Sequence, residues 1–329
     1  MRDSRFSFRA VVLVADAWDE ENSAAPVHLR RDLEMTDPVT LQALIGAIRS
    51  LGIEVTCYSE PAALAENAQE HRDDVVLSIY GGLDSRNRMA LVPAVCECFN
   101  LRFIGPDTYG RIIAQDKEVS KRLAVDSQLL TPAWRVVRTP ADLPYIGGLN
   151  YPVVVKPMLE GSSIGITQRN IAADQKVAAS LAQELLDTFA QPVIIEEFVP
   201  GREVAYARIE HAGPDAWAYS EVAIDGDPDH FQTRLFDANE KLTPTVGRTV
   251  RNIDAELSDE DRRALDTFLS AYGPFGYCRV DGRLANGRFH FLELTPDAWI
   301  APRGQFARGF TEKGWDYYSV IAAVLASAG

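Results

Sequence analysis

The sequence predicts a protein of mixed α/β and α+β class that is built from more than one lobe. Its 329 residues exceed what a single hydrophobic core usually accommodates, so two or three lobes are expected. Strands alternate with helices up to Ile104, which is typical of a parallel sheet. Beyond Asp116, strand-like segments joined by short turns indicate antiparallel pairing.

The N-terminal part carries the pattern of a doubly wound parallel sheet. Residues 11–15 are all apolar and predict a buried strand. Asp37 and Pro38 predict the N-cap and the first position of a helix that ends near Gly52. Further strands are expected at 53–57, 75–79 and 101–104, and further helices at 61–69 and 92–99.

The remainder of the chain is expected to begin with a helix that Asp116 and Lys117 open. Asn286 and Gly287 form the tight turn of a predicted hairpin. The expected strands are 134–137, 153–156, 192–199, 203–209, 277–284 and 289–294, and the expected helices are 172–190, 258–273 and 312–326.

Composition and charge exclude several classes of partner. The net charge of −14 argues against nucleic acids and anionic membranes, since both require a basic surface. A small nucleotide requires only a few local cations and stays possible. No apolar run reaches transmembrane length, and residues 1–6 lack the apolar core of a signal peptide, so we expect a cytoplasmic protein.

The four cysteines, Cys57, Cys96, Cys98 and Cys278, are too few and too scattered for a disulfide framework. Cys96 and Cys98 are two residues apart, but no second Cys or His pair follows to complete a zinc site. Buried thiols are the expectation.

A stretch rich in Gly and Ser follows the apolar run before Lys156. We expect residues 152–167 to form a hairpin with a glycine-rich tip. Free backbone N–H groups at such a tip, the hydroxyls of Ser162 and Ser163, and the ammonium of Lys156 suit an anion. An ordinary surface hairpin is equally compatible with this stretch alone.

Two carboxylates occupy the predicted 277–294 hairpin. Pairing about Asn286 and Gly287 places Asp281 and Glu293 close to opposite one another. Two adjacent carboxylates repel each other, and a divalent cation commonly compensates them. Oxygen ligands without a soft ligand favour Mg²⁺, or Mn²⁺, over zinc. The alternative is a pair of solvated charges on an exposed sheet face.

Residues 195–199 and Glu203 form a further pattern of interest. The end of a buried strand offers backbone N–H and C=O groups to a flat heterocycle, and a nearby carboxylate can accept hydrogen bonds from ribose. Strand ends that carry Glu are common, so this pattern alone does not decide the function.

Taken together and in order, these segments resemble the ATP-grasp superfamily, and specifically D-alanine–D-alanine ligase and its relatives. The resemblance runs from about Leu101 to Gly304, and the segment 153–165 is close to the family's most specific signature. It implies a three-lobed ATP-grasp architecture with ATP between the last two lobes. The implied division is an N-terminal parallel α/β lobe at 1–108, a central lid at 109–196 and a C-terminal lobe at 197–329.

The resemblance also implies roles for individual residues. Lys117 and Lys156 match the lysines that contact nucleotide phosphates, and Lys241 matches a loop lysine that closes over the γ-phosphate. The residues implied for the rest of the nucleotide site are Glu160, Ser162 and Ser163 in the loop and Glu196, Glu197, Val199 and Glu203 around adenine and ribose. Asp281 and Glu293 match magnesium ligands, with Thr295 at the third ligand position, and Arg279, Lys241 and Ser162 are expected to act in catalysis.

The implied reaction activates a carboxylate with ATP to an acyl-phosphate, which an amine then attacks to form an amide, with release of ADP and phosphate. Such phosphoryl transfer needs charge neutralisation and positioning rather than a protein nucleophile. The five histidines share no spacing that suggests a catalytic set.

The departures from the family pattern lie on the substrate side. Segments 16–22 and 80–86 replace the family's Ser-x-Glu and His-Gly motifs, Leu242 replaces a loop tyrosine, Thr295 replaces an asparagine, and Trp299 lies where the family has a glycine. Asp297 is a candidate to compensate for Thr295 as a metal ligand. We therefore expect amino-acid-like substrates other than two D-alanines, contacted by Trp299, Arg303 and Gly304.

Three alternatives stay open, and two are excluded because their motifs are missing. An intramolecular cyclase, a D-alanine–D-alanine ligase proper and a non-catalytic nucleotide-binding module remain possible. A nicotinamide oxidoreductase and a P-loop kinase lack their glycine motifs here. Relatives are often homodimers, so a homodimer is also possible.

Overall fold

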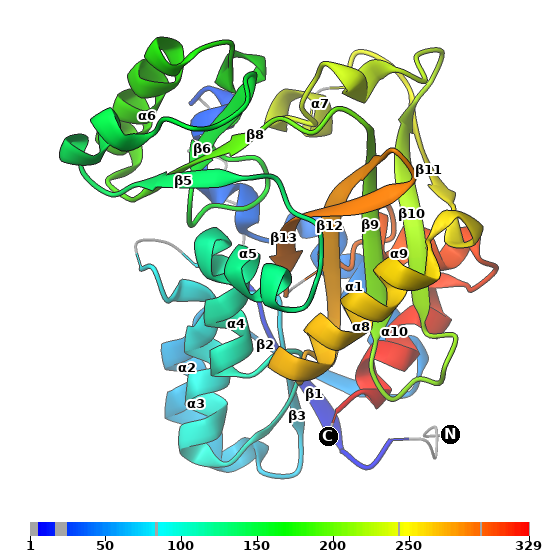
Figure 1. The fold of residues 1–329 in the computed structure, drawn as a ribbon. Helices are drawn as coiled ribbons and strands as arrows, with labels where there is room; N and C mark the ends of the chain where they lie inside the picture. Colours follow the sequence, from blue (N-terminus) through cyan, green and yellow to red (C-terminus); the bar gives the residue numbers. More distant parts are fainter. Residues whose placement is uncertain (1–5, 17–24, 83–84, 243, 297, 329) are drawn as a thin grey trace.

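The computed structural model describes residues 6–16, 25–82, 85–242, 244–296 and 298–328 and arranges them around three β-sheets (Figure 1). The first is parallel, and the second and third are antiparallel. The expected mixture of α/β and α+β structure is confirmed.

The first sheet has the strand order β2-β1-β3-β4 and is parallel throughout. Alternate residues of β1 face opposite sides: Val11 and Leu13 pack toward α1, whereas Val12 and Val14 pack toward α2 and α3. Helices therefore cover both faces, as the doubly wound prediction requires. The elements are β1 (Ala10–Val14), β2 (Glu54–Tyr58), β3 (Val75–Ser78), β4 (Arg102–Ile104), α1 (Pro38–Ser50), α2 (Pro61–Asn67) and α3 (Leu91–Phe99).

The second sheet, which we call the lid sheet, has the order β5-β8-β6-β7, and α6 packs against it (Figure 1). Alternating Val153, Val155, Val193 and Ile195 contribute to its core. Its elements are β5 (Trp134–Val137), β6 (Val153–Pro157), β7 (Ile171–Ala172), β8 (Val193–Glu197) and α6 (Gln175–Phe189).

The predicted hairpin at residues 152–167 is wrong in its return strand. β6 pairs with β7, and a wide loop of residues 158–170, which we call the glycine–serine loop, joins them. Ile164 is buried in the core beside α6 instead of pairing as a strand. Gly165 has φ +75°, and a Cβ there would collide with the Pro157 ring, so the turn requires glycine.

The third sheet has the order β11-β10-β9-β12-β13. The predicted turn at Asn286 and Gly287 is confirmed, with φ angles of 52° and 73° that are typical of a two-residue hairpin. The strands β10 and β11 escaped prediction. The elements are β9 (Arg202–Ile209), β10 (Trp217–Ile224), β11 (Arg248–Asn252), β12 (Tyr277–Ala285), β13 (Arg288–Thr295), α4 (Thr108–Gln115), α5 (Lys117–Asp126), α7 (Ala238–Leu242) and α8 (Asp259–Tyr272).

The predicted final helix at 312–326 is wrong. The chain forms two helices, α9 (Gln305–Glu312) and α10 (Tyr317–Ala326), which residues 313–316 separate. Gly314 has φ +99°, which no helix accommodates, and the Asp316 side chain accepts a hydrogen bond of 2.7 Å from the Ser319 N–H to cap α10.

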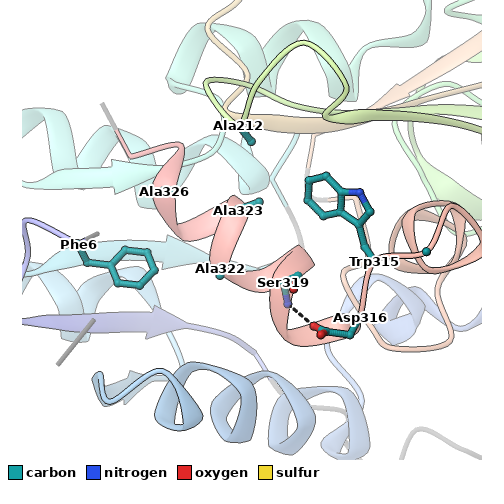
Figure 2. Close-up of a pocket in the computed structure, with 9 residues that line it drawn as sticks. Phe6, Ala212, Trp315, Asp316, Ser319, Ala322, Ala323 and Ala326 are labelled. Atoms are coloured by element: carbon teal, nitrogen blue, oxygen red, sulfur yellow. Dashed lines mark hydrogen bonds between the residues drawn. The ribbon is translucent and has the colours of Figure 1, made fainter. Parts of the chain in front are cut away.

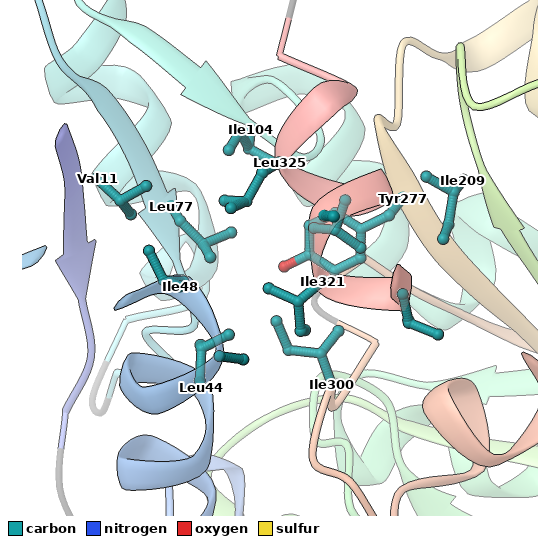
Figure 3. Close-up of a cluster of buried hydrophobic side chains, with 14 of the residues drawn as sticks. Val11, Leu44, Ile48, Leu77, Ile104, Ile209, Tyr277, Ile300, Ile321 and Leu325 are labelled. Carbon is teal, nitrogen blue, oxygen red and sulfur yellow. The ribbon is translucent and has the colours of Figure 1, made fainter. Parts of the chain in front are cut away.

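One hydrophobic cluster joins the first and third sheets (Figure 3). Val11 of β1, Leu44 of α1 and Ile321 of α10 lie in the same cluster as Ile209 of β9 and Tyr277 of β12. The parallel first sheet and the third sheet, which we call the C-terminal sheet, therefore share a continuous core.

The cysteines are all free. Cys96 and Cys278 are buried as expected, but Cys57 and Cys98 are exposed, so that part of the prediction is wrong. In the described ranges no helix is long and apolar enough to cross a membrane.

The shared core generates a stability prediction. Leu44 is 0% exposed, so Leu44→Ala should lower the free energy of unfolding by about 2–5 kcal/mol, because it leaves a cavity. Chemical denaturation measures this. Val39→Ala on the same helix is the control: Val39 is 78% exposed, and the change should stay within about 0.5 kcal/mol. Equal effects of the two substitutions would contradict the packing described.

Candidate active site

A cleft lies between the lid sheet and the C-terminal sheet, and most of the predicted site residues line it. Strands β6 and β8 supply one side, and β9, β12 and β13 supply the other. The lining residues are Lys117, Val154, Lys156, Glu160, Ser163, Ile166, Glu196, Glu197, Phe198, Val199, Glu203, Leu235, Phe236, Lys241, Asp281, Arg283, Leu292 and Glu293.

Two buried lysines enter the cleft from different elements. Lys117 is the first residue of α5, whose N-cap Asp116 accepts hydrogen bonds from two backbone N–H groups of the first turn. Its ammonium donates to the backbone carbonyl of Glu160 and lies 3.2 Å from Glu293 Oε2. Lys156, on β6, donates to Glu196 Oε1. Each lysine thus contacts the carboxylate of a glutamate that also lines the cleft.

Asp281 and Glu293 lie directly opposite each other in the β12–β13 register, as the hairpin predicted. Arg279 donates to both oxygens of Asp281, at 2.6 and 2.9 Å. Burial raises the pKa of Glu293, but the charges of Lys117, Lys156 and Lys241 outweigh burial and hold that pKa at about 2. Each carboxylate therefore has a cationic side chain in contact with it.

The carboxylate pair fits a magnesium ion whose other ligands are phosphates and water, which is the arrangement Mg²⁺ usually adopts in nucleotide sites. The Thr295 hydroxyl donates to Asp281 Oδ2 at 2.8 Å and so orients this carboxylate. Among the described residues there is no cluster of three or more Asp, Glu, His or Cys side chains that could hold a metal by itself. Asp297 lies outside the described residues.

Lys241 of α7 links the glycine–serine loop to the C-terminal lobe. Its ammonium lies 2.7 Å from the hydroxyl of Ser163, which in turn donates to the backbone carbonyl of Phe236 at 3.0 Å. Burial lowers the pKa of Lys241, and the neighbouring Glu293 and Glu203 oppose that shift. The loop is thus bonded above the carboxylate pair.

One part of the cleft, which we call the apolar slot, is lined by apolar side chains. Val154, Ile166, Phe198 and Leu292 line it beside the end of β8, where Glu197 accepts hydrogen bonds from Asn150. Sequence reasoning did not select Val154, Ile166 or Leu292, whereas Phe198 lies in the predicted segment 195–199. Strand periodicity could have found Val154, because it lies two positions before Lys156 on the same face of β6.

Glu203 has a partner that sequence reasoning also missed. Arg283 Nε lies 2.8 Å from Glu203 Oε2, and the two residues are paired in the β9–β12 register. Burial raises the pKa of Glu203, and Arg283 opposes this shift.

The structure does not place every predicted residue at the cleft. Ser162 is exposed and is absent from the lining, whereas Arg279 and Thr295 reach the site only through Asp281. Trp299 is 48% exposed, and Gly304 is buried against it. Arg303 is exposed.

A buried arginine ties the N-terminal lobe to the glycine–serine loop. Arg88 donates to Glu34, to the Leu159 carbonyl at 3.1 Å and to Glu160 at 3.2 Å. The backbone N–H of Gly161 donates to Glu34 at 2.7 Å. Burial raises the pKa of Glu34, and the charge of Arg88 opposes the shift. This cluster holds the loop against residues from the parallel sheet's lobe.

A second cavity, of about 510 Å³, lies on the outer side of α10, away from all these residues (Figure 2). Its wall is the alanine-rich face of α10 together with Trp315 and Phe6. The Asp316 carboxylate at its edge caps α10. None of the predicted site residues lines this cavity.

The three sheets and the cleft between the second and third define an ATP-grasp fold. Over 97% of both chains the fold superposes on the D-alanine–D-alanine ligase of Bacillus anthracis with a TM-score of 0.69 and 16% identity. The D-Ala:D-Ser ligase VanG of Enterococcus faecalis gives a TM-score of 0.68 at 16% identity, over 97% of this chain and 99% of that chain.

Sequence comparison identifies the family more closely. A family model described as "D-ala D-ala ligase C-terminus" matches residues 133–326, and the chain belongs to this family. The D-alanine–D-alanine ligase of Thermotoga petrophila is 27% identical over 288 residues, which are 86% of this chain and 89% of that protein. The enzyme of the same name from Gloeobacter violaceus is 29% identical over 87% of this chain and 92% of its own length. The resemblance to D-alanine–D-alanine ligases is confirmed.

The Arg88 cluster generates a prediction. Arg88→Met leaves the buried carboxylates of Glu34 and Glu160 without their shared cation, so the free energy of unfolding should fall by about 3–5 kcal/mol. Adding Glu34→Gln to this variant should recover part of the loss, because one uncompensated charge disappears. Denaturation of the single and double variants measures the coupling. Strictly additive losses would contradict the buried ion pair.

Proposed function

We propose that the protein is an ATP-dependent carboxylate–amine ligase that forms an amide or peptide bond through an acyl-phosphate and releases ADP and phosphate. The observation that carries the proposal is the convergence of Lys117, Lys156 and Lys241 on the Asp281–Glu293 pair in one cleft beside an apolar slot. Membership in a ligase family supports the same reaction.

The lysines would change partners when the nucleotide binds. In the structure Lys117 and Lys156 neutralise carboxylates, and a triphosphate offers them a higher density of negative charge. Glu293, once Lys117 leaves it, and Asp281, which Arg279 contacts, would hold Mg²⁺, which supplies charge neutralisation at the phosphates. The base would lie in the apolar slot, and the ribose would lie against Glu203.

Phosphoryl transfer would then depend on positioned cations. Lys241 and Arg279 lie near the carboxylate pair, where they would stabilise the charge that develops on the transferred group. The glycine–serine loop, bonded to Phe236 through Ser163, would exclude water from the acyl-phosphate. Ser162 would act only after a movement of this loop, because it is exposed in the structure.

We further propose amino-acid-like substrates other than two D-alanines. Trp299 fills a position where the family has glycine, and a bulk change of this size reshapes an acceptor pocket. Arg303 and Gly304 lie on the same segment and complete the proposed acceptor contacts. D-alanine–D-alanine ligation itself is the second candidate, because the curated relatives carry that name.

Several expectations stay predictions. These are the division into lobes at 1–108, 109–196 and 197–329, the homodimer, the cytoplasmic location, and Mn²⁺ as a substitute for Mg²⁺. An intramolecular cyclase and a non-catalytic nucleotide-binding module are the remaining alternatives for the activity.

The reaction can be tested directly. Purified protein with ATP, Mg²⁺ and a panel of D- and L-amino acids, singly and in pairs, should release ADP and phosphate for a subset of the panel, because the activation step forms an acyl-phosphate. Chelation of the metal should abolish the release. AMP as the product would refute the acyl-phosphate, turnover with D-alanine alone would favour the second candidate, and ATP binding without turnover would indicate a binding module.

The cationic residues give a second prediction. Arg279→Met and Lys156→Met should each lower kcat by about 100-fold or more, because charge stabilisation in the transition state is lost. Lys156→Met should remain folded, since Glu196 keeps Lys121 as a partner. Steady-state ADP release measures kcat, and the exposed Lys176→Met is the matched control with unchanged kcat. Retention of wild-type kcat in both cleft variants would contradict the assigned roles.

A further inference from the structure

Lys121 is a buried lysine that sequence reasoning did not select. It lies one helical turn after Lys117 on α5, so the two side chains leave the same face of the helix. Lys121 is 0% exposed and is absent from the cleft lining, whereas its partner Glu196 lines the cleft. Lys121 therefore lies behind Glu196 as seen from the cleft and cannot touch a nucleotide bound there.

The contacts of Lys121 fix its position. Its ammonium lies 2.8 Å from Glu196 Oε2 and donates to Thr131 Oγ1 at 2.8 Å. The Thr131 hydroxyl donates in turn to the Phe291 carbonyl of β13 at 2.9 Å. The Trp134 ring lies 5.7 Å from the ammonium. Segments of α5, β5 and β13 thus hold the charge in place.

Glu196 lies between two lysines, one on each carboxylate oxygen. Lys156 contacts Oε1 from the cleft side, and Lys121 contacts Oε2 from behind. One carboxylate needs only one cation for neutralisation. When Lys156 moves to the phosphates, Lys121 therefore still neutralises the buried carboxylate of Glu196. Lys121 has no such alternative partner, because it does not reach the cleft.

We propose that Lys121 is a positioning residue for the nucleotide base: it keeps the Glu196 carboxylate charged and oriented as a hydrogen-bond acceptor after Lys156 turns to the phosphates. The site then favours adenine over guanine. The inference rests on the proposed ATP-dependent function and deepens it. It assigns the choice of base to a residue that the base does not contact.

The protonation state of Glu196 links Lys121 to the base. An ionised carboxylate only accepts hydrogen bonds, whereas a protonated one also donates. Adenine carries an amino donor where guanine carries a carbonyl acceptor. Without a buried cation, desolvation favours the protonated form of Glu196, and the discrimination between the two bases disappears.

The pKa shifts agree with this geometry. Burial would raise the pKa of Glu196, but the charges of Lys121 and Lys156 keep it below its ordinary value. Burial lowers the pKa of Lys121 to about 8, against the opposing charge of Glu196, so Lys121 stays protonated at neutral pH.

Nucleotide titrations of the full chain test the inference. Wild-type protein should bind ATP more tightly than GTP in the presence of Mg²⁺. Lys121→Met should reduce this preference by about tenfold, which corresponds to the loss of one charge-assisted hydrogen bond. Lys121→Arg should restore the preference, because arginine keeps the charge. Lys176→Met, on the surface of α6, should leave the preference unchanged.

A second measurement guards against simple misfolding. Without nucleotide, Lys121→Met should keep a thermal midpoint close to that of wild type, because Glu196 retains Lys156 as its partner. An unchanged ATP-to-GTP ratio in Lys121→Met, or an equal loss of affinity for both nucleotides, would overturn the role of Lys121. Failure of the wild-type chain to bind ATP would instead overturn the proposed function, and this inference with it.

Discussion

Pairing of opposite charges inside the cleft is the constraint on which the rest of the site depends. Glu293 faces Lys117, and Glu196 faces Lys156, in an environment that would otherwise favour the neutral forms. Under the proposed function these lysines move from carboxylate to phosphate when the nucleotide binds. The same interactions stabilise the cleft without nucleotide and, under the proposed function, prepare it to receive one.

Much of the fold could be predicted from local pattern, because strand and helix periodicity is a local property. The glycine–serine loop could not. Ile164 is apolar because it fills the core beside α6, and the sequence cannot distinguish that packing from strand pairing. Likewise Gly314 interrupts what looks like one amphipathic helix at 312–326, and only the left-handed backbone reveals the break.

The charged residues at the cleft were accessible to sequence reasoning because they lie in short motifs, such as Lys156 and the Asp281–Glu293 hairpin. Arg88 and Lys121 were not, because their partners Glu160 and Glu196 lie far away along the chain and neither residue lies in a recognisable motif. A buried charge is defined by its neighbours. Arg88 and Lys121 could therefore be recognised as buried, paired charges only from the structure.

The glycine–serine loop is bonded to two other parts of the molecule. Gly161 meets Glu34 near the parallel sheet, whereas Ser163 meets Phe236 near the C-terminal sheet. The lid sheet itself is an insertion that connects to the remainder of the chain only before β5 and after β8. An opening of the lid sheet would bend the chain at these two connections and would break the contacts of the loop with Glu34 and with Phe236. Under the proposed function, entry of the nucleotide would then be coupled to release of the loop from Glu34.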